Sequence, residues 1–156
     1  MTIPANLVDL IGHWRGTNRL WLSPADPVHE SGSTMLVAPA AQGRFITFQY
    51  TWDYEGDQQD GLLLLGVKPH PVAVKAVWID SWHMQDNYML CEETNGEQGE
   101  IFLTGSMQCL PGRIGAGRLK LSPGCLTSFN CLCITFHLRA HRTWQCKPDS
   151  SAKNNR

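Results

Sequence analysis

Between residues 13 and 106, the chain consists of short segments in which apolar and polar residues alternate, separated by turn-forming residues. The clearest alternation covers residues 43–52, where one face would carry Arg44, Ile46, Phe48, Tyr50 and Trp52. A period of two predicts a half-buried β-strand. Similar segments lie at 13–22, 33–38, 62–67, 76–84, 87–93 and 100–106. Their regular spacing predicts an antiparallel all-β sandwich or barrel.

The first residues of the chain depart from this pattern. Residues 4–11 would place Leu7, Leu10 and Ile11 on one side of a short helix, which Gly12 would end. Two polar stretches are expected to separate strands, namely a loop over residues 23–32 and an acidic turn over residues 53–61. Because no later segment shows a helical period, we expect a single short helix at the start of an all-β fold.

The stretch 76–84, AVWIDSWHM, has an acidic residue between two tryptophans. As a strand, it would place Trp78, Asp80 and Trp82 on one face, and Lys75 and His83 on the other. A carboxylate among aromatic rings must find hydrogen-bond donors or change its pKa. Asp80 is therefore either the polar group of an aromatic-lined ligand cavity or a residue that holds a turn or a neighbouring backbone. We predict that its face points inward, with both tryptophans buried and Lys75 exposed.

Charge divides the chain into two parts. Residues 1–112 contain five Lys/Arg and thirteen Asp/Glu, a net charge of −8, whereas residues 113–156 contain eight Lys/Arg and one acid, a net charge of +7. Four of the six cysteines also lie in the second part. The acidic first part argues against nucleic acid as a partner. We interpret residues 1–112 as a β-barrel domain and residues 113–156 as a divergent, basic, Cys-rich tail.

Motifs of the common enzyme classes are absent from the sequence. It contains no GxGxxG, P-loop, GxSxG or HExxH, and no spacing typical of a Ser–His–Asp triad, so no catalytic residue is predicted. The most metal-like residues lie in the tail, but a CxC inside an apolar run is not a usual zinc spacing and no metal site is predicted. That set comprises Cys131, Cys133, His137, His141 and Cys146.

The expected cellular location follows from the absence of targeting and membrane-spanning segments in the sequence. No segment reaches the roughly 20 apolar residues that a membrane-spanning helix needs, so we expect no membrane partner. The first ten residues, MTIPANLVDL, lack the basic and then apolar regions of a signal peptide. We therefore expect a cytoplasmic protein, with Cys91 and Cys109 present as reduced thiols.

Several short motifs occur in an order that resembles a bacterial family, the domain of unknown function 1579. They are GHWRG at 12–16, GRFITFQYTW at 43–52, GLLLLGV at 61–67, WIDSWHM at 78–84 and LTGS at 103–106. The resemblance covers about residues 10–110. It implies an up-and-down antiparallel calycin-like barrel, similar in shape to lipocalins, fatty-acid-binding proteins and haem-carrying nitrobindins, with the N-terminal helix closing one end. It implies no activity, since the family has none assigned.

The resemblance stops near residue 112, and the genetic code offers an explanation. Residues 112–117, GRIGAG, can be encoded so that the neighbouring reading frame gives PDWGW, a pattern expected in the later strands of the family. Residues 129–137, FNCLCITFH, can be encoded at the same offset to give QLLMYNIS, which contains the expected MYNI. We interpret the tail as a frameshifted translation of the end of the same barrel. Closure of the barrel by C-terminal strands is therefore in doubt.

Three functional hypotheses remain open. The first is a protein that binds a small apolar or amphipathic ligand in an aromatic-lined cavity. The second is a haem- or metal-dependent barrel enzyme that uses His83, although His83 is expected on the face opposite Trp78. The third is a structural or interaction domain in which the aromatic residues only fill the core. No cofactor is predicted, and the sequence indicates neither the ligand nor the oligomeric state. The ligand-binding residues expected under the first hypothesis are Trp14, Tyr50, Trp52, Trp78, Asp80 and Trp82.

Overall fold

The computed structural model describes residues 5–22, 25, 27–69, 72–82, 86–94, 101–109, 113–123, 132–137 and 141–148. Side chains are described between Leu7 and Gly105, with gaps, and the strands after Gly105 are described by their backbone alone. The strands are β1 (Gly12–Trp21), β2 (His29–Ala40), β3 (Phe45–Tyr54), β4 (Asp57–Pro69), β5 (Val72–Asp80), β6 (Met89–Thr94), β7 (Ile101–Cys109), β8 (Arg113–Pro123), β9 (Leu132–His137) and β10 (His141–Pro148).

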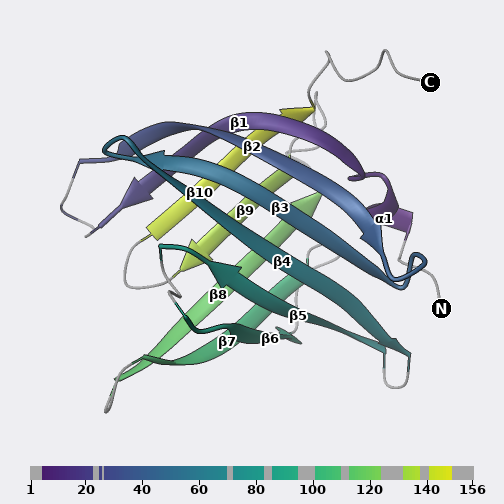
Figure 1. The fold of residues 1–156 in the computed structure, drawn as a ribbon. Coiled ribbons are helices and arrows are strands. Elements are labelled where there is room, and N and C mark those ends of the chain that lie inside the picture. The colour runs from purple at the N-terminus through teal and green to yellow at the C-terminus, as the bar shows by residue number, and fades with distance from the viewer. Residues whose placement is uncertain are drawn as a thin grey trace.

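Consecutive strands pair antiparallel throughout the described sheet, from β1 to β10. Strand β10 also pairs with β1, so that the strand order returns to its start. Figure 1 shows β1–β4 as a curved layer that lies across the later strands β7–β10. The prediction of an all-β fold built from up-and-down antiparallel strands is confirmed.

The N-terminal segment forms one helical turn, α1 (Ala5–Val8), which is shorter than the predicted helix over residues 4–11. The turn ends with two backbone hydrogen bonds, from Leu10 N to Leu7 O at 3.2 Å and from Ile11 N to Val8 O at 3.1 Å. Leu7 and Leu10 are buried, whereas Ile11 is exposed. The two buried leucines hold this turn against the sheet, and Gly12 already belongs to β1.

The acidic turn predicted over residues 53–61 is a tight hairpin turn, shorter than predicted. Strand β3 ends at Tyr54 and β4 begins at Asp57, so only Glu55 and Gly56 connect them. Their φ angles are 53° and 89°, and positive φ at both central positions is typical of a type I′ hairpin turn. Because two residues are enough for this turn, the polar residues on either side remain in the strands. Likewise, β2 begins at His29, inside the predicted loop 23–32.

Alternate residues of the strands are buried on one face of the sheet, which we call the inner face; the opposite face is the outer face. On β3, the inner positions from Ile46 to Trp52 are 3 % exposed or less, as the alternation predicted, while Arg44 is exposed in the turn before the strand. Neighbouring strands align these positions in rows across the sheet. One row consists of Val37, Phe48, Leu63, Trp78 and Met89, each paired with the next.

Candidate functional site: a buried carboxylate among aromatic residues

A second row of the inner face brings three of the predicted site residues onto one line. The register pairs Trp14 with Met35 and Met35 with Tyr50. It then pairs Tyr50 with Gly61 and Gly61 with Asp80. Trp14, Met35, Tyr50 and Asp80 are all buried. Residues that are distant in the sequence therefore lie in one row across the strands.

The side chain of Tyr50 crosses Gly61 to reach Asp80. Neighbouring strands lie about 4.8 Å apart, so the backbones of Tyr50 and Asp80 are separated by about 10 Å. The Tyr50 hydroxyl donates a hydrogen bond to Asp80 Oδ2 at 2.7 Å. A Cβ atom added to Gly61 would overlap the hydroxyl of Tyr50. Glycine therefore leaves the space that the tyrosine ring needs, and the ring covers the bare strand backbone.

Two further hydrogen bonds involve this pair. Trp78 Nε1 donates to Tyr50 Oη at 2.6 Å, and the backbone N–H of Trp82 donates to Asp80 Oδ1 at 2.9 Å. Each carboxylate oxygen of Asp80 thus accepts a hydrogen bond, which offsets part of the cost of burying the group at 3 % exposure. The contact with Trp82 N confirms that Asp80 holds neighbouring backbone. Its contact with a ligand stays a prediction.

Trp82 lies in a turn, and its predicted place in a strand over residues 76–84 is wrong. Strand β5 ends at Asp80 because the carboxylate accepts the backbone N–H of Trp82. The preceding N–H, that of Ser81, donates to Asp60 O at 2.9 Å and closes the strand end. The predicted direction of the face is confirmed for Trp78 and Asp80, which are buried, and for Lys75, whose side chain is 54 % exposed. Trp82 itself is only half-buried.

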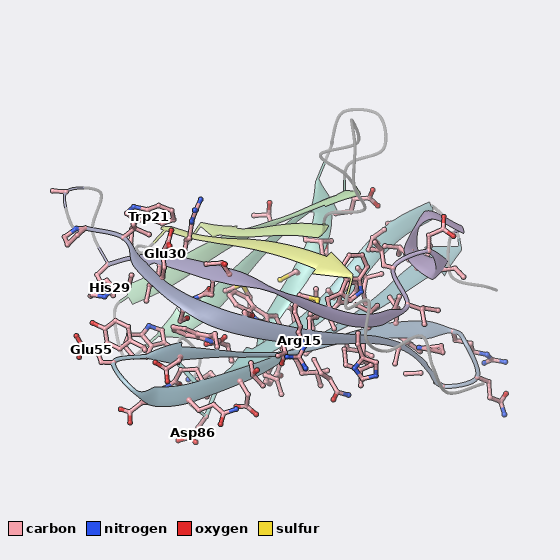
Figure 2. The ribbon with its side chains drawn as sticks, turned by 90° about the horizontal axis from the view of Figure 1, so that it is seen from above. Arg15, Trp21, His29, Glu30, Glu55 and Asp86 are labelled. Carbon is pink, nitrogen blue, oxygen red and sulfur yellow. The ribbon has the colours of Figure 1, made fainter. Side chains whose placement is uncertain are left out.

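An aromatic chain extends from the inner face toward one end of the sheet. The ring centroids of Trp52 and Trp82 lie 5.7 Å apart in an edge-to-face arrangement, and those of Trp82 and Tyr54 lie 4.5 Å apart. The ring of His29 lies 5.3 Å from that of Tyr54. Figure 2 shows His29 at the same end of the molecule as Trp21 and Glu55. Such tilted aromatic pairs are individually favourable.

Tyr54 and His29 are residues of this site that the sequence did not predict. Tyr54 continues the alternation of residues 46–52, which is the available signal, but the predicted strand ends at Trp52 because residues 53–61 are predicted as an acidic turn. For His29, the sequence offered no signal, because it stands at the first position of β2 inside a polar stretch.

Trp14 joins the inner face to the N-terminal turn. Its indole Nε1 donates to the backbone oxygen of Leu10 at 2.8 Å, and the side chain is 5 % exposed. The hydrogen bond satisfies the polar atom of a large buried ring and fixes the chain just before β1. Trp14 therefore has a structural role, while its predicted ligand contact stays untested.

A hollow of about 540 Å³ borders Tyr50, Gly61 and Asp80. The tryptophans predicted to line a cavity, Trp14, Trp52, Trp78 and Trp82, are not among its lining residues. The hollow thus lies on the outer face, behind the Tyr50–Gly61–Asp80 row. Its remaining lining comes from outer-face positions of β2–β5 and the turn after β5, namely Thr34, Leu36, Gln49, Thr51, Asp60, Leu62, Ile79 and Ser81.

Cofactor ligands are not evident in the described part of the chain. There, no group of three His, Cys, Asp or Glu side chains is placed to hold a metal ion. His83, the candidate axial ligand for haem, lies outside the described residues, as do the side chains of the metal-like set in the tail. Cys91 is buried, and burial raises the pKa of its thiol to about 11. The thiol is therefore protonated at neutral pH and a weak nucleophile.

Comparison with known families gives a match that contains the residues of this site. A family described as "Protein of unknown function (DUF1579)" matches residues 5–113. The chain belongs to this family. The DUF1579 match runs from α1 to the first residue of β8 and ends where the charge of the sequence changes sign. No curated protein matches the chain. Among the described residues, no helix is long and apolar enough to cross a membrane.

Proposed function

We propose that this protein is a calycin-like barrel that binds a small amphipathic molecule against its inner face. The observation that carries the proposal is a carboxylate, Asp80, held at 3 % exposure among aromatic side chains by the hydroxyl of Tyr50. Ligand sites in proteins are mostly apolar, with a few polar groups that fix orientation. The Trp78–Tyr50–Asp80 hydrogen-bond chain supplies such a polar group in an apolar surrounding.

Two kinds of side chain contact the ligand, aromatic and polar. Trp52 and Trp78 contribute apolar area to the body of the ligand. Asp80 accepts a hydrogen bond from the polar end of the ligand, and Tyr50 sets the position of the carboxylate. Because a carboxylate only accepts hydrogen bonds, the preferred ligand carries a donor, such as an ammonium or hydroxyl group, at one end of an apolar chain.

Two probes of equal chain length test this division. Decylamine and decanoate present the same apolar body with opposite charges, and binding of each is measured by the change in tryptophan fluorescence of the purified chain. We expect decylamine to bind at least about tenfold more tightly, since a hydrogen bond between charged groups contributes about 1.5–3 kcal/mol. Native mass spectrometry of the same sample would show whether a small molecule accompanies the purified protein.

Matched variants connect the preference to Asp80. Asp80→Asn should remove most of the preference for the amine. Asp86→Asn should leave it unchanged, because Asp86 is exposed and takes no part in the hydrogen bond between Tyr50 and Asp80. Trp78→Phe should weaken both probes together, because it changes the apolar wall and not the charge. Equal binding of the two probes, or the same loss in both Asn variants, would contradict the proposal and leave the aromatic residues as core.

A further inference from the structure

The outer face of β3–β6 carries an exposed apolar surface, which we call the outer patch. Its most exposed members are Leu90, Ile79 and Phe45, which are 58 %, 43 % and 39 % exposed. The register joins the members across the sheet, since Leu62 pairs with Ile79, and Leu64 pairs with Val77, which pairs with Leu90. The outer patch consists of Phe45, Leu62, Leu64, Val77, Ile79 and Leu90.

Two hollows lie in line along this patch. One, of about 580 Å³, is lined by Phe45, Leu64, Val77 and Leu90 among others, and the other, of about 540 Å³, by Leu62 and Ile79 among others. Between Phe45 and β4, the first hollow is shaped by Gly66, where an added Cβ would lie 2.7 Å from the ring of Phe45. An apolar surface that is both continuous and hollowed indicates an interaction site more strongly than scattered exposed residues do.

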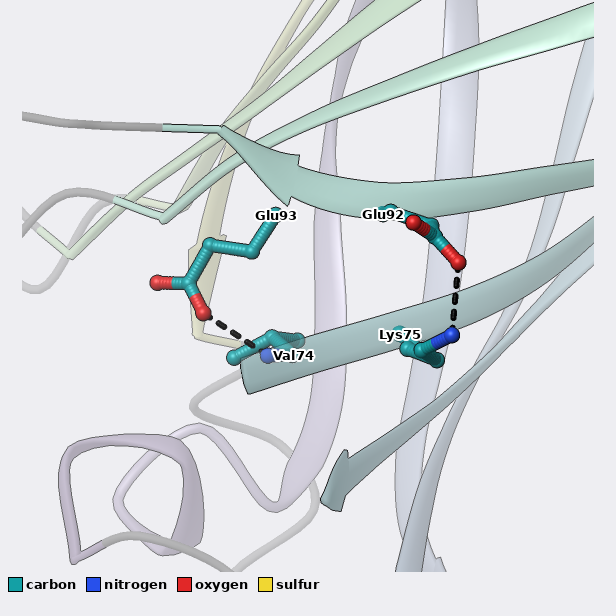
Figure 3. Close-up of polar contacts among 4 residues, drawn as sticks. All are labelled: Val74, Lys75, Glu92 and Glu93. Carbon is teal, nitrogen blue, oxygen red and sulfur yellow. Dashed lines mark hydrogen bonds and ion pairs between the residues drawn. The ribbon is translucent and has the colours of Figure 1, made fainter. Parts of the chain in front are cut away.

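Opposite charges lie at the two ends of the outer patch. Arg44, Lys68 and Lys75 line the hollow at one end, where Lys75 Nζ also contacts Glu92 Oε1 at 2.6 Å (Figure 3). At the other end, Asp60 lines the second hollow. The hairpin turn with the acidic residue Glu55 joins β3 and β4 on that side, and Figure 2 shows Glu55 at one end of the molecule. The surface is thus basic at one end, apolar in the middle and acidic at the other.

We propose that the outer patch binds a second copy of this chain around a two-fold axis that runs parallel to the patch and crosses β4 at right angles near Leu64. A surface with this order of charges is complementary to itself when one copy is turned by half a rotation, which is the requirement for a symmetric dimer. The register places Lys68 four residues beyond Leu64 and Asp60 four residues before it. The axis therefore sets Lys68 of each copy over Asp60 of the other.

The apolar centre of the outer patch matches itself under the same rotation. Leu64 pairs with Val77, and Val77 pairs with Leu90, so these three residues form one row across the strands. The row lies along the axis, so each of its residues faces its own counterpart in the other copy. Apolar side chains thus oppose apolar ones in the middle, and opposite charges meet at both ends.

The size of the surface is compatible with a reversible dimer. From β2 to β6 the face is about 19 Å wide, and from Lys68 to Asp60 it is about 26 Å long, giving a footprint of about 500 Å². Small specific interfaces bury up to about 600 Å² on each partner, so the dimer is expected to dissociate on dilution.

Sedimentation velocity of the full chain over a wide range of concentration tests the dimer. Leu90→Glu places like charges over one another on the axis of the proposed interface and should weaken dimerisation at least about tenfold. Val28→Glu is the control, because Val28 is also an exposed apolar residue, 40 % exposed, and does not belong to the outer patch. Circular dichroism of each variant checks that the sheet is retained. A chain that is monomeric at every concentration, or a dimer equally affected by both changes, would overturn the proposal.

A charge exchange tests the two-fold arrangement itself. Lys68→Glu and Asp60→Lys should each weaken the dimer, because each places like charges over one another. The double variant restores opposite charges across the axis and should recover most of the lost affinity. Dimerisation that is insensitive to both single changes, or a double variant weaker than either, would overturn the arrangement.

Discussion

The chain has two parts that both form β-strands but differ in sequence. One part matches the family, and the other consists of the last three strands. Residues 5–113 carry the alternating faces, the buried row through Tyr50 and Asp80, and most of the acidic residues. Strands β8–β10 carry a basic sequence beyond the family match. Both parts nevertheless pair antiparallel, and β10 pairs with β1 from Trp14 to Trp21.

The difference separates two requirements of a sheet. Pairing of strands uses backbone N–H and C=O groups, which every residue except proline supplies. Packing of a face depends on which side chains alternate, and a shift of one residue moves all of them to the other side. A segment can therefore take a place in the sheet without a sequence suited to its inner face. We propose that β8–β10 are such a segment, translated in a shifted frame from about residue 112.

Restoring the frame is expected to have the largest effect. A gene in which the codon after Pro111 is continued in the neighbouring frame should encode strands with a selected inner face. The repaired chain should melt cooperatively and at least about 5 °C higher, because the added apolar burial stabilises the folded state. Calorimetry or circular dichroism of the two purified chains measures this. If the chain as given melts as sharply and as high as the repaired one, residues 113–156 are not out of frame.

Matched truncations compare packing in the two parts. Leu63→Ala removes a side chain that is 1 % exposed on β4, and it should cost about 3 kcal/mol of the free energy of unfolding. Leu132→Ala makes the same chemical change on β9 and should cost less than about 1 kcal/mol if that strand has no selected inner face. Urea unfolding of both variants gives the comparison. Equal losses would show that β9 packs as well as β4.

The smallest expected effect concerns the thiol of Cys91. Its pKa in the folded chain is about 11, raised by burial, whereas an unfolded thiol ionises near 8.5–9. Alkylation of Cys91 by iodoacetamide, followed by peptide mapping, should therefore accelerate up to about pH 11 in the folded chain but level off near pH 9 in urea. Because only the unfolded thiol ionises between these values, folding stability should fall as the pH rises through this window. The same pH profile in both states would place Cys91 outside the core.

The alternation of apolar and polar residues predicted the strands, whereas the contacts between strands depend on their register. The pattern of residues 43–52 was enough to place Phe48, Tyr50 and Trp52 inside, because a strand period is a property of neighbouring residues. The contact between Tyr50 and Asp80 depends on how β3, β4 and β5 align, which no short stretch encodes. The role of Gly61 could not be predicted for the same reason, because it depends on the Tyr50 ring that lies over this glycine. The outer patch could not be predicted either, because Leu90 and Phe45 come onto one surface only through the pairing of β3–β6.

Gly61 restricts which amino-acid replacements this protein can accept during evolution. The Tyr50 hydroxyl occupies the place where the first side-chain carbon of any other residue would lie. Replacement of the glycine alone is therefore blocked while the tyrosine points to Asp80, and loss of the tyrosine removes one hydrogen-bond donor from the carboxylate. The three positions are expected to change together or not at all among related genes, as one inherited unit spread over three strands.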